Sequence, residues 1–135
     1  MNKPTEKELE LRELWLQSLE KNPERQGKYC LGSKYKDSYL ACCLGECVIV
    51  HGDDVWEENR LIVADPLNIK EPTRALLYNY KKYFLRSKYG DLKTSAVIKG
   101  NEFSSLSAIN DRGITWPEIA AYIRSNPDNV FTDND

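Results

Sequence analysis

Residues 103–123 (FSSLSAINDRGITWPEIAAYI) contain more independent structural signals than any other part of this chain. Phe103, Leu106 and Ile109 recur at helical spacing. Gly113 follows at the position where many helices end in a residue of left-handed conformation. We therefore predict a first helix that starts near Phe103 and ends just before this glycine.

A second helix is predicted directly after the glycine. Thr115 and Glu118 form the T-x-x-E pattern of a capping box, in which each side chain accepts a hydrogen bond from the backbone of the other residue. Pro117 falls in the first turn, where a missing N–H costs nothing. Asn126 ends the helix, because the residue before a proline avoids the helical conformation.

The remaining apolar segments predict further helices. Thr5 and Glu8 form another capping box, which opens a helix through about Lys21. Pro72 starts a segment with a helical apolar stripe. The segment Ser38–Val50 (SYLACCLGECVIV) fits either a buried helix or a buried strand, since periodicity alone does not separate the two. We predict a helix there, capped by Ser38.

These segments together predict a mainly α fold of about five helices. A single globular domain is expected over residues 1–127, followed by an acidic, frayed tail over residues 128–135. We interpret residues 26–37 as a loop or a loose hairpin. The predicted strands form one short two-stranded ribbon, in which Leu61–Ala64 pairs with Ala96–Ile98.

Composition restricts the class of protein. Charged residues make up 30% of the 135 residues and hydrophobic residues 41%, which is typical of a soluble domain. We find no apolar run long enough to cross a bilayer and no apolar region of a signal peptide near the N-terminus. A cytoplasmic location is therefore expected.

Four residues with thiol or imidazole side chains invite a metal-site interpretation. They are Cys30, Cys43, Cys47 and His51, of which the last three would share one helix face. Their spacing lacks the C-x-x-C pairs that mark most zinc sites. We favour the alternative that the cysteines are small buried hydrophobic residues, and we expect no cofactor. Cys47 lies in an apolar run next to Glu46, which also argues against a catalytic thiolate.

A basic and aromatic segment is the second candidate site. Its residues are of the types that bind phosphates and stack on bases: Tyr78, Lys81, Lys82, Arg86, Lys88 and Tyr89. The favoured interpretation is structural, with Tyr80 and Phe84 in the core and the lysines in solvent. A helix-turn-helix DNA reader built from the C-terminal helix pair is a weaker alternative, since its second helix has only Glu118 and Arg124 as charged residues.

Motifs in both halves of the chain resemble a known family. They are Trp15 and Leu19, Gln26-Gly27-Lys28, Tyr39 to Cys47 with its Cys-Cys-Leu-Gly core, Leu106-x-x-Ile109-Asn110-Asp111-x-Gly113, and Glu118-Ile119-Ala120 with Ile123. This pattern resembles a family of small bacteriophage and prophage proteins that have a YCCLG segment, an LNDxG segment and an EIA helix, and no assigned activity. The chain departs from the pattern by separating Tyr29-Cys30 from Cys42-Cys43. The resemblance implies a phage origin and no mechanism. The Asn110-Asp111 pair itself is expected to stabilise the turn by hydrogen bonds to backbone.

Acids, bases and nucleophiles do not converge at any recognisable spacing in this sequence. We therefore predict a non-enzymatic binding module, a phage accessory or host-interaction protein whose partner is a host or phage protein and not a membrane. One alternative is a nucleotide or nucleic-acid binding protein that uses the segment from Tyr78 to Tyr89. The other is a zinc-binding protein that uses the cysteines and His51.

The nucleic-acid alternatives predict salt-dependent binding of oligonucleotides. Labelled duplex and single-stranded oligonucleotides should bind at about 50 mM salt, where phosphate contacts are strong, and dissociate as the salt concentration rises. Fluorescence anisotropy measures both. An absence of binding at the lower salt concentration would exclude the basic segment and the helix-turn-helix together.

Overall fold

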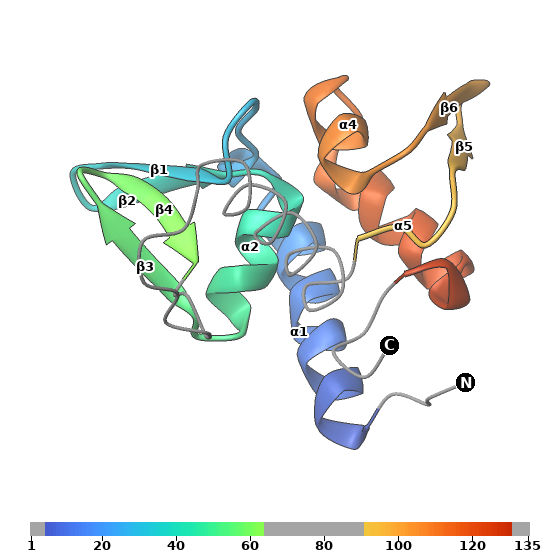
Figure 1. The fold of residues 1–135 in the computed structure, drawn as a ribbon, viewed down its shortest axis with the longest axis horizontal. Coiled ribbons are helices and arrows are strands. Elements are labelled where there is room, and N and C mark those ends of the chain that lie inside the picture. The colour runs from blue at the N-terminus through green and yellow to red at the C-terminus, as the bar shows by residue number, and fades with distance from the viewer. Residues whose placement is uncertain (1–4, 64–90, 131–135) are drawn as a thin grey trace, which may run out of the picture.

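A computed structural model describes residues 5–63 and 91–130 of the chain. Its elements follow in this order: α1 (Glu6–Lys21), a 3-10 turn (Pro23–Arg25), β1 (Gly32–Tyr35), β2 (Ser38–Ala41), α2 (Cys43–Val50), β3 (Asp54–Glu57), β4 (Arg60–Val63), β5 (Ala96–Ile98), β6 (Asn101–Phe103), α4 (Leu106–Asp111), α5 (Trp116–Ser125) and a second 3-10 turn (Pro127–Asn129). Figure 1 shows the first four strands on one side of α2, with α4 and α5 on the other side.

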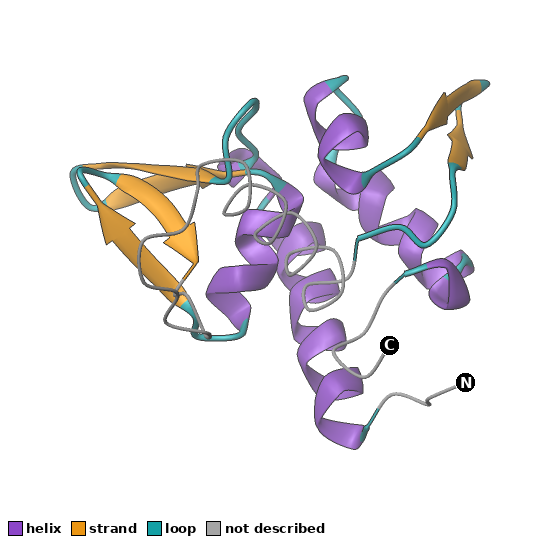
Figure 2. Cartoon of the chain, viewed as in Figure 1, coloured by secondary structure: helices purple, strands orange, loops and turns teal. Residues whose placement is uncertain are grey.

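The fold is mixed α/β, so the prediction of a mainly α protein is wrong. Strands β1 to β4 form an antiparallel sheet in the order β2-β1-β4-β3, and β5 and β6 form a separate two-stranded ribbon (Figure 2). The predicted pairing of Leu61–Ala64 with Ala96–Ile98 is also wrong. Strand β4 pairs with β3 and β1, whereas β5 pairs with β6 across a short turn.

The strand pairs are joined by turns that lack the usual sequence signal. Glu58 and Asn59 both have positive φ, at 48° and 67°, between β3 and β4. Lys99 and Gly100 also have positive φ, at 53° and 79°, between β5 and β6. Two consecutive residues of positive φ make the type I′ turn that suits a twisted hairpin, which is normally marked by Asn-Gly or Asp-Gly. Because three of these four residues are not glycine, the sequence did not indicate these two turns or the hairpins that they close.

The segment Ser38–Val50 is divided between a strand and a helix. Residues 38–41 form β2, and the helix α2 begins only at Cys43. The cap is therefore Cys42 rather than Ser38, with its Sγ accepting a hydrogen bond from the N–H of Gly45 at 3.4 Å. A methyl group at Gly45 would collide with the backbone oxygen of Leu31, so glycine lets β1 and α2 approach closely.

The two helix starts that were predicted from capping boxes are confirmed. Thr5 and Thr115 each form a complete capping box at the start of α1 and α5. Gly113 has a φ of 88°, as expected past the end of α4. The start of α4 differs, because Ser105 caps that helix and Phe103 belongs to β6.

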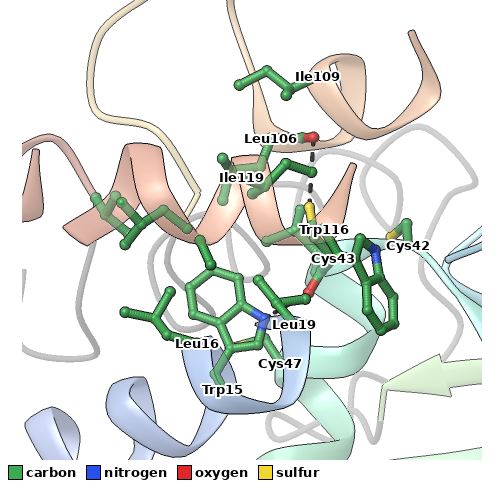
Figure 3. Close-up of a cluster of buried hydrophobic side chains, with 14 of the residues drawn as sticks. Trp15, Leu16, Leu19, Cys42, Cys43, Cys47, Leu106, Ile109, Trp116 and Ile119 are labelled. Carbon is green, nitrogen blue, oxygen red and sulfur yellow. Dashed lines mark hydrogen bonds between the residues drawn. The ribbon is translucent and has the colours of Figure 1, made fainter. Parts of the chain in front are cut away.

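Helices α1, α2, α4 and α5 enclose the main core (Figure 3). Trp15 and Trp116 are fully buried within it, and the indole N–H of Trp15 donates to the backbone oxygen of Cys43 at 2.8 Å. The buried side of α1 carries Trp15, Leu16 and Leu19, whereas Leu14 is 54% exposed instead of buried as its spacing suggests. Val130 is also buried, so the core extends past the predicted domain end at residue 127.

Asn110, at the end of α4, connects four separate segments. Its side chain is completely buried. The amide oxygen accepts hydrogen bonds from the backbone N–H of Cys43 at 3.2 Å, the indole N–H of Trp116 at 3.0 Å and the amide of Gln26 at 3.2 Å. The amide nitrogen donates to the oxygen of Gly27 at 2.6 Å. The side-chain hydrogen bonds of Asn110 therefore reach backbone far away in the sequence, at Cys43 and Gly27, whereas the prediction was of bonds to nearby backbone of the turn.

Replacing Asn110 with alanine should destabilise the fold strongly. The N–H groups of Cys43 and Trp116 and the oxygen of Gly27 would each lose a buried partner, at about 1–3 kcal/mol per group. We expect the free energy of unfolding in urea to fall by at least about 3 kcal/mol. The control is Asn101→Ala at an exposed position of β6, which should change it by less than about 0.5 kcal/mol. Equal effects of the two substitutions would contradict this role of Asn110.

Candidate functional site

The four predicted metal ligands do not come together. Cys30 is exposed, whereas Cys43 is buried with its Sγ 3.6 Å from the backbone oxygen of Leu106. Cys47 and His51 are neighbours on α2, with Sγ and Nδ1 3.6 Å apart. Across residues 5–63 and 91–130, no three His, Cys, Asp or Glu side chains are grouped so that they could hold a metal ion.

Cys47 and His51 are also badly arranged for nucleophilic catalysis. Nδ1 of His51 lies 2.8 Å from the backbone oxygen of Cys47, an atom that only accepts, so this nitrogen carries a proton and donates it there. It therefore cannot take the proton of the Cys47 thiol. Burial raises the pKa of Cys47 and of Cys43 well above the ordinary value for a thiol. Both side chains are neutral thiols that fill the core, as Figure 3 shows.

Thiol reactivity should separate Cys30 from the other three cysteines. Cys30 is exposed, whereas burial raises the pKa of Cys42 to about 11 and that of Cys43 and Cys47 further from the reactive range. We expect one thiol to react rapidly with a disulfide reagent in the native chain and all four only after unfolding in denaturant. Absorbance of the released thiolate measures this. Rapid reaction of two or more thiols in the native chain would contradict the burial.

The predicted basic segment, from Tyr78 to Tyr89, lies outside the described residues, and its role in binding stays a prediction. The helix-turn-helix alternative can be compared with α5. At the start of this helix Trp116 is buried, and Glu118 forms an ion pair with Lys99 at 2.6 Å while it caps the helix. The first turn of α5 is therefore used for packing and capping rather than presented to a groove of DNA. None of the described helices is long and apolar enough to cross a membrane.

A groove of about 640 Å³ lies between the first 3-10 turn and the β1–β2 hairpin. Its lining combines aromatic, charged and small polar side chains: Glu24, Arg25, Ser33, Tyr35, Asp37, Ser38, Tyr39 and Leu40. Among these lining residues, Tyr35 is 73% exposed and Leu40 is 49% exposed. We refer to this feature as the hairpin groove.

Beneath the hairpin groove lies a buried carboxylate. Glu46 of α2 is only 2% exposed, and its oxygens accept hydrogen bonds from the hydroxyl of Ser18 at 2.7 Å and that of Tyr39 at 2.9 Å. Arg25 lies 3.7 Å from the same carboxylate and donates to the Tyr39 hydroxyl at 3.1 Å. The carboxylate therefore has the partners that a buried charge requires.

Tyr39 is held rigidly by this arrangement. Burial, followed by the negative charge of Glu46 and the hydrogen bond to it, raises the pKa of Tyr39 to about 12. The phenol consequently stays protonated at neutral pH and keeps its donated bond to the carboxylate. Its ring forms one wall of the hairpin groove at a fixed position.

Aromatic and cationic side chains alternate beside the groove. The guanidinium of Arg25 lies 5.1 Å from the centre of the Tyr39 ring, and the ring of Trp56 lies 6.0 Å from that of Tyr39. On the other side, the ammonium of Lys34 lies 4.6 Å from the Trp56 ring. Tyr, Trp and Arg are the residues that most often dominate the binding energy of protein interfaces.

The sequence analysis did not select these residues, because they come from separate segments. Arg25, Tyr39, Glu46 and Trp56 lie on the first 3-10 turn, β2, α2 and β3. One signal was available: Glu46 stands within an apolar run, and a carboxylate in such a place needs buried partners.

Comparison of the chain with protein-family models, curated proteins and solved structures found no match.

Proposed function

We propose that this chain is a non-enzymatic binding protein that contacts a protein partner through the hairpin groove. The observation that carries the proposal is the exposed pair Tyr35 and Leu40, which line the hairpin groove together with Tyr39, whose hydroxyl is fixed by Glu46. Large side chains that are immobilised before binding lose little entropy in a complex, which favours affinity. A groove with apolar walls and a few fixed polar groups is the usual form of a recognition site.

The arrangement of the reactive groups supports binding over catalysis. Three of the four thiols are buried in the core, and Nδ1 of His51 is occupied by the Cys47 carbonyl. Glu46 beneath the groove is covered and bonded to Ser18 and Tyr39. In a binding protein, the buried thiols, the imidazole and the buried carboxylate have a structural role only.

The biological setting that we propose is a phage accessory or host-interaction role. It rests on the resemblance of the Cys42-Cys43-Leu44-Gly45 and Asn110-Asp111 motifs to those of the phage and prophage family. The partner is accordingly a host or phage protein.

The proposal predicts that two exposed side chains control capture of a partner. The tagged full chain is incubated with bacterial lysate, and bound proteins are quantified by mass spectrometry. The double variant Tyr35→Ser, Leu40→Ser should reduce recovery of the captured protein at least about tenfold, since loss of interface anchors typically costs more than 1 kcal/mol each. Both side chains point away from the core, so circular dichroism should show an unchanged fold.

The matched control is Val97→Ser, which removes a 67% exposed apolar side chain from the β5–β6 ribbon, outside the groove. It should retain full recovery. Capture that survives the double variant, or that is lost equally in the control, would exclude the hairpin groove as the contact surface.

A further inference from the structure

Strand β2 is an outer strand of the four-stranded sheet. It pairs with β1 in the register Gly32–Ala41, Ser33–Leu40, Lys34–Tyr39 and Tyr35–Ser38. In an antiparallel hairpin, residues that exchange hydrogen bonds with the neighbouring strand alternate with residues whose backbone groups point away from it. Once the direction of the backbone N–H and C=O groups of one residue is known, the directions of these groups in the other residues of the hairpin follow.

Two hydrogen bonds fix this alternation. The N–H of Lys34 donates to the oxygen of Asn59 at 2.7 Å and so points toward β4, away from its partner Tyr39. The N–H of Cys42 donates to the oxygen of Leu31 at 3.1 Å, which continues the pairs that do exchange bonds. The backbone N–H and C=O of Tyr39 consequently point outward from the edge of the sheet.

The chain itself already uses one part of this edge. The outward oxygen of Ala41 accepts a hydrogen bond from the N–H of Gly27 at 2.7 Å, and Gln26 forms a parallel bridge with Ala41. Just before Gln26 the chain turns away into the first 3-10 turn, Pro23–Arg25. The hairpin groove opens where the chain leaves the edge, beside Tyr39.

We infer that the partner binds as an extended peptide that adds a strand to the edge of β2 and pairs with the backbone of Tyr39. The inference rests on the proposed function and specifies its mode of recognition. Unpaired backbone groups on an outer strand are a template for such an addition, in which main-chain hydrogen bonds supply affinity.

The side chains around the edge of β2 determine which residue types the bound peptide should contain. A peptide residue beside Tyr39 places its side chain on the same face as Tyr39 and Lys34, where Arg25 supplies a second positive charge. Its two neighbours lie on the opposite face, next to Leu40 and Ser38 of β2, with Tyr35 paired to Ser38 on the adjoining strand. The peptide therefore has one acidic residue flanked by apolar residues. Glu24 and Asp37 also line the groove, so a longer acidic run is disfavoured.

The experiment starts from a displayed library of random linear peptides selected on the full chain. We expect enriched peptides to share an acidic residue between two apolar ones. In a synthetic copy of the best peptide, N-methylation at alternate positions should weaken binding at least tenfold, and methylation at the intervening positions should have little effect. Methylation removes a main-chain donor and adds a methyl group, both of which disrupt pairing only where the N–H faces β2, so an effect without this alternation would overturn strand addition.

Hydrogen exchange measured by NMR provides the second readout. The amide of Tyr39 should exchange at least tenfold more slowly in the presence of the peptide. The matched control is the amide of Trp56, which by the same alternation points outward from β3, the other outer strand, and should be unaffected. Loss of the effect on Tyr39, or an equal effect on Trp56, would overturn the inference.

Two further outcomes separate the inference from the proposed function. In the first outcome, capture of a partner depends on Tyr35 and Leu40, but no peptide is enriched and the Tyr39 amide is not protected. This result would exclude strand addition and leave the proposed function intact. Failure of both experiments would remove both. Protection of Tyr39 that rises with the concentration of the chain alone would assign the edge to a second copy of the chain and overturn the peptide.

Discussion

The buried amide of Asn110 is the interaction on which the arrangement of the other elements depends. It connects the chain that follows the first 3-10 turn, the start of α2, the end of α4 and the start of α5 through hydrogen bonds to Gln26, Gly27, Cys43 and Trp116. Since every buried polar group must be satisfied, these segments have one compatible arrangement. The Gln-Gly, Cys-Cys-Leu-Gly and Asn-Asp motifs that resemble the phage family meet at this amide, so a structural requirement is sufficient to explain them.

The same principle separates the interior from the hairpin groove. Glu46 and Tyr39 satisfy each other below the surface, and Arg25 covers them from the solvent side. This places a rigid aromatic wall next to the side chains of the hairpin. Three of the four thiols are buried in the core, where they serve as packing atoms.

Sequence signals that act within one helical turn predicted where helices begin, whereas the pairing of strands that lie far apart in the sequence could not be predicted. The boundaries of α1 and α5 depend on side chains that bind backbone within the same turn, so Thr5 and Thr115 were sufficient to locate them. The sheet depends on turns such as Glu58–Asn59, whose positive φ is imposed by the fold rather than by residue type. Tyr39 lies next to Trp56 only because the register of β1 with β2 and of β4 with β1 and β3 brings their strands together.

The contacts of α1 have a consequence for the order of assembly. Arg12 donates to the backbone oxygens of Pro127 and Val130, and Arg124 binds both Glu13 and Glu20. These partners are more than a hundred residues away from the first helix along the chain. During synthesis α1 is made before α5, so the side of α1 that packs against α5 stays uncovered until α5 has left the ribosome, although Trp15 can already contact α2. The nascent chain therefore exposes apolar surface during this interval, and exposed surface of this kind favours aggregation.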